Sequence, residues 1–235
     1  MPDERQANDD SQDKQDQAVL PPADRESPPG ARMTEIELSD IVHGLAQRLH
    51  LPWLLKYHAR TPIVAVFGLV NGFISIALLS LLAFITHSPF VFPSLGPTAF
   101  LLFFNPTTRP ASPRNTIIGH LIGILAGYFS LVVTGLTNAP PALSTGITVP
   151  RIIAAALALG LTSGLMVLLN TPHPPAGATT LIVALSIISK PLDLVYIMVA
   201  VVILVVQAWL INHLADIPYP LWSIPQRKKT SQKSG

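Results

Sequence analysis

Four long apolar runs, with no charged side chain in any of them, limit the folds open to this 235-residue chain. The runs are residues 63–86, 115–137, 152–170 and 194–214. At a rise of about 1.5 Å per residue, a helix of such length crosses the roughly 30 Å hydrocarbon core of a bilayer. Charged residues make up only 12% of the chain, about half the share of a typical soluble domain. The sequence therefore predicts an all-α polytopic membrane protein with four long transmembrane helices.

Two shorter apolar runs, 97–104 and 176–189, lie between the long ones and are too short or too closely bounded by proline for a full span. A Pro-rich approach precedes each run. Proline interrupts a helix because it lacks an N–H and its ring clashes with the preceding turn. We therefore expect two broken segments, each a half-helix entered through irregular backbone.

The two short runs and their flanks form an internal repeat at an offset of 81 residues (174 − 93 = 81), over about 63–137 and 144–214. At this offset Pro93 matches Pro174, Gly96 matches Gly177, Thr98 matches Thr179, and Pro110 matches Pro191. If each broken segment completes a crossing, the halves are oppositely oriented and form an inverted repeat. The alternative is four spans with two re-entrant loops.

Basic residues predict how the chain lies in the membrane, because cytoplasmic loops carry an excess of Lys and Arg. They precede the first span at Arg48, Lys56 and Arg60, and follow the last at Arg227, Lys228, Lys229 and Lys233. We expect a multi-pass protein of the cell (inner) membrane with both termini in the cytoplasm. Arg109 and Arg114 are then cytoplasmic if each broken segment crosses, and external if both are re-entrant.

Composition divides the chain into four segments. Residues 1–33 are polar, charged and Pro-rich, which predicts a disordered tail. Residues 34–60 hold a linker and an amphipathic helix, expected to lie on the membrane surface or to pack on the protein. Residues 61–216 form the transmembrane domain. Residues 217–235 form a basic cytoplasmic tail that is expected to bind anionic headgroups.

Small residues at a spacing of four predict close helix contacts, because glycine lets helix backbones approach one another in lipid. The stripes are Gly68 and Gly72; Gly119, Gly123 and Gly127; and Ala156, Gly160 and Gly164. The run 194–214 has no such stripe and is expected to face lipid more.

The candidate binding site is the element Pro-x-x-Gly-x-Thr, repeated at the start of each half-helix. A helix start presents unpaired N–H groups and partial positive charge, glycine lets a ligand approach the backbone, and threonine adds a hydroxyl donor. We expect the two starts to form a midplane cage for a small anion. The residues assigned to it are Gly96 and Thr98 in the first half, and His173, Pro174, Pro175, Gly177, Thr179 and Thr180 in the second. The alternative is a structural kink that only shapes the bundle.

Two histidines, His120 and His173, are the candidates for proton coupling, because an ionisable residue at membrane depth is a functional candidate. No Asp or Glu occurs between residues 41 and 192, so no carboxylate is available for this role. His173 has no counterpart in the first half, where Phe92 takes its place. Each histidine could instead hydrogen-bond a carbonyl across a helix contact.

The sequence lacks the motifs of several chemistries. It has no cysteine, its histidines are scattered, and no Gly-x-Ser-x-Gly, phosphate-loop or dinucleotide motif occurs. We therefore expect no metal site, no cofactor, no enzymatic activity and no nucleic-acid partner. The expected partners are a small inorganic anion and the lipid bilayer, and a homo-oligomer is compatible with the sequence.

The tripeptide His173-Pro174-Pro175 resembles the motif that gives the HPP family of integral membrane proteins its name. Segment 93–99 and Pro113-Arg114-Asn115 followed by Gly119-His120 also resemble that family, over about residues 55–215. The resemblance implies a four-span protein with a transport role, and the association of plant chloroplast members with nitrite transport implies nitrite. We therefore predict a membrane transporter for a small anion, with nitrite as the first candidate. The alternatives are a structural or assembly protein without transport activity, and a membrane-embedded enzyme or redox partner.

Overall fold

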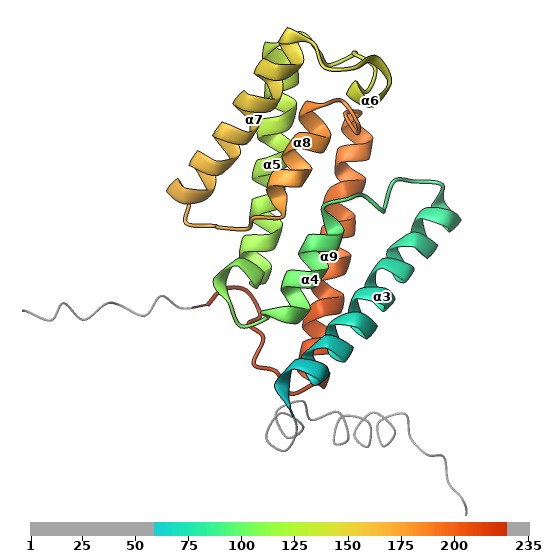
Figure 1. Cartoon of the computed structure of the whole chain (residues 1–235), viewed down its shortest axis with the longest axis vertical. Coiled ribbons are helices and arrows are strands. Elements are labelled where there is room, and N and C mark those ends of the chain that lie inside the picture. Colours follow the sequence, from blue (N-terminus) through green and yellow to red (C-terminus); the bar gives the residue numbers. More distant parts are fainter. Residues whose placement is uncertain (1–58, 225–235) are drawn as a thin grey trace, which may run out of the picture. The chain divides into compact units, whose positions relative to one another are not determined.

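A computed structural model of the chain describes residues 59–224, all of which lie in the second of its two units, Val42–Gly235. This part of the chain is helical and contains no strand. Its elements are α3 (Arg60–Thr86), α4 (Leu95–Phe104), η1 (Arg109–Ala111), α5 (Pro113–Val133), α6 (Ala142–Thr145), α7 (Val149–Leu168), α8 (Ala176–Ala184) and α9 (Pro191–Leu214) (Figure 1).

The prediction of a polytopic α-helical membrane protein is confirmed. Helices α3, α5, α7 and α9 are each long and apolar enough to cross a membrane. The predicted tail at 1–33, nearly all of the segment 34–60, and the tail beyond residue 224 lie outside the described residues.

Prolines and left-handed residues mark where the helices begin and end. Helices α5, α7 and α9 carry proline in their first two positions, where its missing N–H costs no hydrogen bond. The hydroxyl of Ser112 caps α5 by accepting from the Asn115 N–H at 3.4 Å. Helix α3 ends at His87 in the left-handed conformation (φ 51°), which turns the chain towards α4.

The two halves repeat the same order of helices. Shifted by 81 residues, α4 falls on 176–185, against Ala176–Ala184 for α8. The same shift places α5 on 194–214, against Pro191–Leu214 for α9, and α3 on 141–167, against Val149–Leu168 for α7. Each half is therefore a long helix, a half-helix and another long helix, as the sequence predicts.

Helix α4 completes a passage through the helical unit instead of folding back. Near its end, the Leu102 carbonyl accepts from the Asn212 amide close to the end of α9, at 3.2 Å. Residues just after α9 reach the start of α5, where the Arg114 N–H donates to the Trp222 carbonyl at 2.9 Å. One hollow at this end is lined by Arg60, Asn105 and Pro218 among others, so Arg60 and the loop that follows α4 share one end of the unit.

The phenol of Tyr219 fixes the same end. Its hydroxyl donates to the Ala111 carbonyl at 2.7 Å. Burial raises the pKa of Tyr219, which keeps the phenol protonated and able to donate.

Helix α8 ends at the opposite end of the unit. Its last carbonyl groups lie near the short helix α6, where the Ala142 N–H donates to the Leu185 carbonyl at 3.0 Å. Figure 1 shows α4 and α8 running in opposite directions, away from the middle of the unit. This is the arrangement expected of an inverted repeat.

Helix α5 uses its glycine stripe to approach α8. A Cβ added at Gly123 would lie 2.8 Å from both the Ala176 carbonyl oxygen and the Thr180 hydroxyl, and one at Gly127 would lie 2.8 Å from the Val183 Cβ. The other stripes serve no contact within the described chain, because nothing lies within 4 Å of a Cβ added at Gly68, Gly72, Gly160 or Gly164.

The expectation that the last span faces lipid more than the others is wrong. In its most apolar stretch 39% of residues are buried, against 17% for α3 and 28% for α7. Alanine provides the small contact surface that glycine provides in α5, since Ala200 and Ala208 are fully buried.

Gly123→Ala is expected to destabilise the protein by about 1–3 kcal/mol, because the new methyl group overpacks against backbone and hydroxyl oxygens of α8. Gly160→Ala is the matched control, since its methyl group meets no atom within 4 Å. Thermal unfolding of the purified protein in detergent measures both. Equal midpoints for the two variants would contradict the close α5–α8 contact.

Single cysteines test the crossing of α4, because the chain has no cysteine of its own. Thr107→Cys, Ser144→Cys and Ser223→Cys place exposed thiols after α4, in α6 and after α9. Membrane-impermeant maleimide is expected to label positions 107 and 223 from one side of oriented vesicles and position 144 from the other. Labelling of 107 and 223 from opposite sides would indicate a re-entrant loop.

Candidate functional site

Four buried polar side chains meet where the two half-helices begin. Ser94 directly precedes α4, Thr98 lies in its first turn, Thr179 lies in the first turn of α8, and His120 comes from the middle of α5. None of the four is exposed. The Ser94 and Thr179 hydroxyl oxygens are 2.6 Å apart, which joins the two broken segments directly. We call Ser94, Thr98, His120 and Thr179 the hydroxyl–histidine cluster.

The hydrogen bonds of the cluster determine where its protons lie. The Thr98 hydroxyl donates to the Ser94 carbonyl at 2.8 Å, so the Thr98 oxygen accepts from His120 Nε2–H at 3.0 Å. Nδ1 of a neutral His120 then accepts from the Thr179 hydroxyl at 2.7 Å, and Thr179 accepts from the Ser94 hydroxyl. A neutral imidazole thus satisfies every member, and both of its nitrogens are used.

His173 lies beside this cluster with only one nitrogen engaged. Its ring is tilted against that of His120, with centroids 4.9 Å apart. Its Nδ1 lies 2.7 Å from the Pro110 carbonyl oxygen and 3.5 Å from the Thr116 hydroxyl. A carbonyl only accepts, so Nδ1 carries a proton and donates. Nε2 is buried and has no hydrogen-bond partner.

A glycine makes room for this histidine. A Cβ at Gly119 of α5 would lie 2.7 Å from the Cβ of His173. The ring therefore packs directly against the α5 backbone, one residue before His120 in the sequence.

Thr180 belongs to a different contact. Its hydroxyl donates to the Ala176 carbonyl at 3.0 Å and pairs with the Thr162 hydroxyl of α7 at 2.9 Å. It therefore joins α7 to α8 and makes no hydrogen bond to the hydroxyl–histidine cluster.

The glycines and prolines of the repeated element lie around the cluster with different exposure. Pro175 is buried and Gly177 is half-buried. A Cβ added at Gly177 would lie 3.5 Å from a methyl carbon of Leu159, which is an ordinary packing distance. Gly96 and Pro174 are exposed, and no atom lies within 4 Å of a Cβ added at Gly96. Gly96 therefore faces away from other atoms of the described chain.

The expectation of unpaired N–H groups at the second helix start is wrong. The N–H groups of Ala176, Gly177 and Ala178 donate to the carbonyls of His173, Pro174 and Pro175 at 3.0, 3.0 and 3.1 Å. Tight turns of this kind use the donors that an ordinary helix start leaves free. The donors that remain for a ligand at α8 are therefore side chains.

The arginines serve helix ends and do not contact the cluster. Arg109 and Arg114 donate to the Asn170 carbonyl at 3.2 and 3.3 Å, beyond the end of α7. Arg151 is buried and donates to the Leu185 carbonyl at 3.3 Å, at the end of α8. A guanidinium at a helix C-terminus offsets the negative end of the helix dipole. Among residues 59–224, no three His, Cys, Asp or Glu side chains gather closely enough to hold a metal ion.

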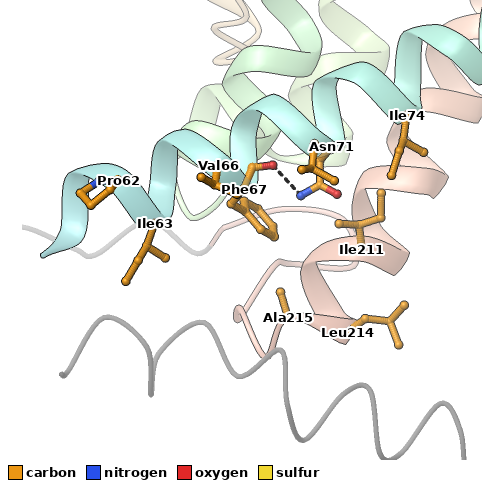
Figure 2. Close-up of a pocket in the computed structure, with 10 residues that line it drawn as sticks. Pro62, Ile63, Val66, Phe67, Asn71, Ile74, Ile211, Leu214 and Ala215 are labelled. Atoms are coloured by element: carbon orange, nitrogen blue, oxygen red, sulfur yellow. Dashed lines mark hydrogen bonds between the residues drawn. The ribbon is translucent and has the colours of Figure 1, made fainter. Parts of the chain in front are cut away.

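One hollow of the described chain lies elsewhere and does not contain the predicted site. It has a volume of about 590 Å³ and lies between α3 and the end of α9, lined by apolar side chains and Asn71 (Figure 2). The Asn71 amide donates to the Phe67 carbonyl of its own helix at 2.8 Å. This hollow is therefore an apolar surface, and it holds none of the predicted anion-binding residues.

Sequence reasoning missed Ser94, Thr116 and Thr162. Ser94 was recognisable in principle, because it lies inside the repeated element directly before the helix start. Thr116 and Thr162 lie within long apolar helices, where a threonine usually bonds its own helix, so nothing in the sequence marks them.

Comparison with known proteins agrees with the fold. The profile of the HPP transmembrane region matches residues 58–220, which include the whole hydroxyl–histidine cluster and His173. A transmembrane protein of Dictyostelium discoideum is 31% identical over 134 residues, which cover 55% of this chain and 44% of that protein. A second from the same organism is 30% identical over 154 residues, 62% of this chain and 46% of that protein.

The chain thus spans less than half the length of these two relatives. No solved structure matches it. Because the HPP transmembrane profile covers well over half of the sequence and all four apolar helices, this chain belongs to the HPP family of multi-pass membrane proteins.

Proposed function

We propose that this protein is a membrane transporter for a small anion, nitrite first among the candidates, and that the anion binds at the hydroxyl–histidine cluster beside His173. The observation that carries the proposal is the 2.6 Å contact between Ser94 and Thr179, which brings two interrupted helices from opposite halves together. Interrupted helices that meet at the interface of inverted repeats are where many secondary transporters bind substrate.

The chemistry of the cluster favours a small anion over a cation. Its hydroxyls can rotate to donate to a ligand instead of to each other. No Asp or Glu occurs between residues 41 and 192, so α4, α5 and α8, which form the cluster, carry no carboxylate that would compete for these donors or attract a cation.

The remaining assignments belong to the same proposal. The protein acts as a carrier and not as an enzyme, in the cell (inner) membrane, with both termini in the cytoplasm. The start of α3 and the segment after α9 line one hollow, which supports a common side for the two ends of the described chain. A basic tail on the cytoplasmic side would bind anionic headgroups. A homo-oligomer would be required only if a second copy completes the pathway.

The direct test is uptake of nitrite, nitrate, formate and chloride into lipid vesicles that contain purified protein. Wild-type protein is expected to take up nitrite faster than empty vesicles do. Thr179→Val is expected to lower the rate at least about tenfold, because it leaves His120 Nδ1 and the Ser94 hydroxyl without their partner. Thr86→Val is the matched control, since the Thr86 hydroxyl bonds only the Leu82 carbonyl of its own helix.

Thermal unfolding of the same preparations separates a lost site from a lost fold. A folded Thr179→Val protein with wild-type uptake would remove the cluster from the pathway. Wild-type vesicles that take up no tested anion would favour an assembly protein. A bound cofactor seen in the absorption spectrum would favour a membrane-embedded enzyme or redox partner.

A further inference from the structure

His120 and His173 lie side by side but differ in what each can still bind. Both rings are fully buried. His120 has a partner on each nitrogen, whereas His173 has a partner only on Nδ1. A buried imidazole nitrogen without a partner is costly, and a ligand that bonds Nε2, alone or together with a proton, would complete it.

We propose that each anion is carried together with one proton, which His173 takes up on Nε2, so that transport is electroneutral. This inference rests on the proposed function, because it names the co-substrate of the same site. The substrate is then a weak acid in its dissociated form, and the protein moves the equivalent of the undissociated acid.

Nδ1 of His173 cannot be the proton acceptor. It already carries a proton and donates it to the Pro110 carbonyl at 2.7 Å. A further proton can therefore bind only at Nε2, which carries an unshared electron pair in the neutral ring.

Both nitrogens of His120 already have a hydrogen-bond partner when the ring is neutral. Protonation of its Nδ1 would turn the Thr179 hydroxyl towards Ser94 and displace the proton that Ser94 donates there. Because protonation of His120 would break this set of hydrogen bonds, we expect His120 to stay neutral and His173 to take up the proton.

The charged groups around His173 are few. Helix α5 presents the His120 ring. Helix η1 presents the Pro110 carbonyl and begins with Arg109. Helix α7 presents Met166, which lies near Gly119 beside His173. The guanidinium of Arg109 binds the Asn170 side chain at 2.7 Å. None of these three elements carries a carboxylate, so none of them neutralises a protonated His173, and the anion is the counter-charge that we assign to it.

The anion and the proton are expected to bind together because of their charges. An anion cannot bind beside the unshared pair of a neutral Nε2, because two electron-rich groups repel. A buried imidazolium without a counter-charge is also unfavourable. On binding, a proton from water forms an N–H bond at Nε2 and the anion accepts from it. On release, that bond breaks and the proton leaves to water with the anion, and no group is oxidised or reduced.

The test uses vesicles that contain full-length protein, loaded with a pH-sensitive dye, and a membrane potential set by potassium and valinomycin. Nitrite uptake is expected to carry one proton per anion. It should rise as the external pH falls, by up to about tenfold per unit, the limit for one bound proton, and should not respond to the potential. Passive diffusion of nitrous acid is subtracted with protein-free vesicles at each pH.

His173→Gln is expected to separate the two ligands, because its amide can donate near the position of Nε2 but cannot take up a proton. Its residual nitrite uptake should lose the pH dependence and become sensitive to potential. His213→Gln is the matched control, since His213 lies at the far end of α9 and bonds the Trp209 carbonyl. This control should keep the coupling of the wild type.

The outcomes separate the two proposals. Nitrite uptake without protons, or uptake driven by the potential, would overturn the coupling and leave the transporter intact. Absence of any anion uptake would overturn both. If His173→Gln does not fold, His173→Asn replaces it, because its amide can keep the bond to Pro110. Proton-coupled uptake by a folded His173→Asn protein would place the proton elsewhere.

Discussion

The hydrogen bond between Ser94 and Thr179 ties the first half of the membrane domain to the second at the point where both helices are interrupted. Lipid offers no partner for free backbone or hydroxyl groups, so an interruption persists only where protein surrounds it. Helix α5 provides most of that surrounding: its glycines let α8 approach, and its histidine binds both threonines. Without this junction, two half-helices would leave polar groups unpaired in the membrane.

The arginines make their hydrogen bonds at helix ends and not to this junction. Two half-helices that start in the middle of the unit end at its two opposite faces. The carbonyl groups at the end of α8 are met by Arg151 and those beyond the end of α7 by Arg109 and Arg114. Positive side chains thus sit at helix ends, and the centre relies on neutral donors.

Much of the fold was predictable from the sequence because the bilayer restricts the alternatives. Apolar runs without charge require helices, and prolines require the interruptions, so α4 and α8 were both expected. The finer arrangement was not predictable. Whether an N–H group at Ala176 is free depends on the turn before it, and whether Thr162 meets Thr180 depends on how α7 packs. Glycine stripes look alike in sequence, yet only that of α5 has a partner in the described chain.

The two halves share a backbone plan but not the same ring beside the junction. Phe92, 81 positions before His173, is also buried and takes the corresponding place in the first half. A benzene ring neither donates nor accepts, so the first half has no counterpart of the unpaired Nε2 of His173. In the transporter proposed above, opening of the site to the two sides of the membrane would therefore differ in free energy, so two similar halves would still distinguish loading from release.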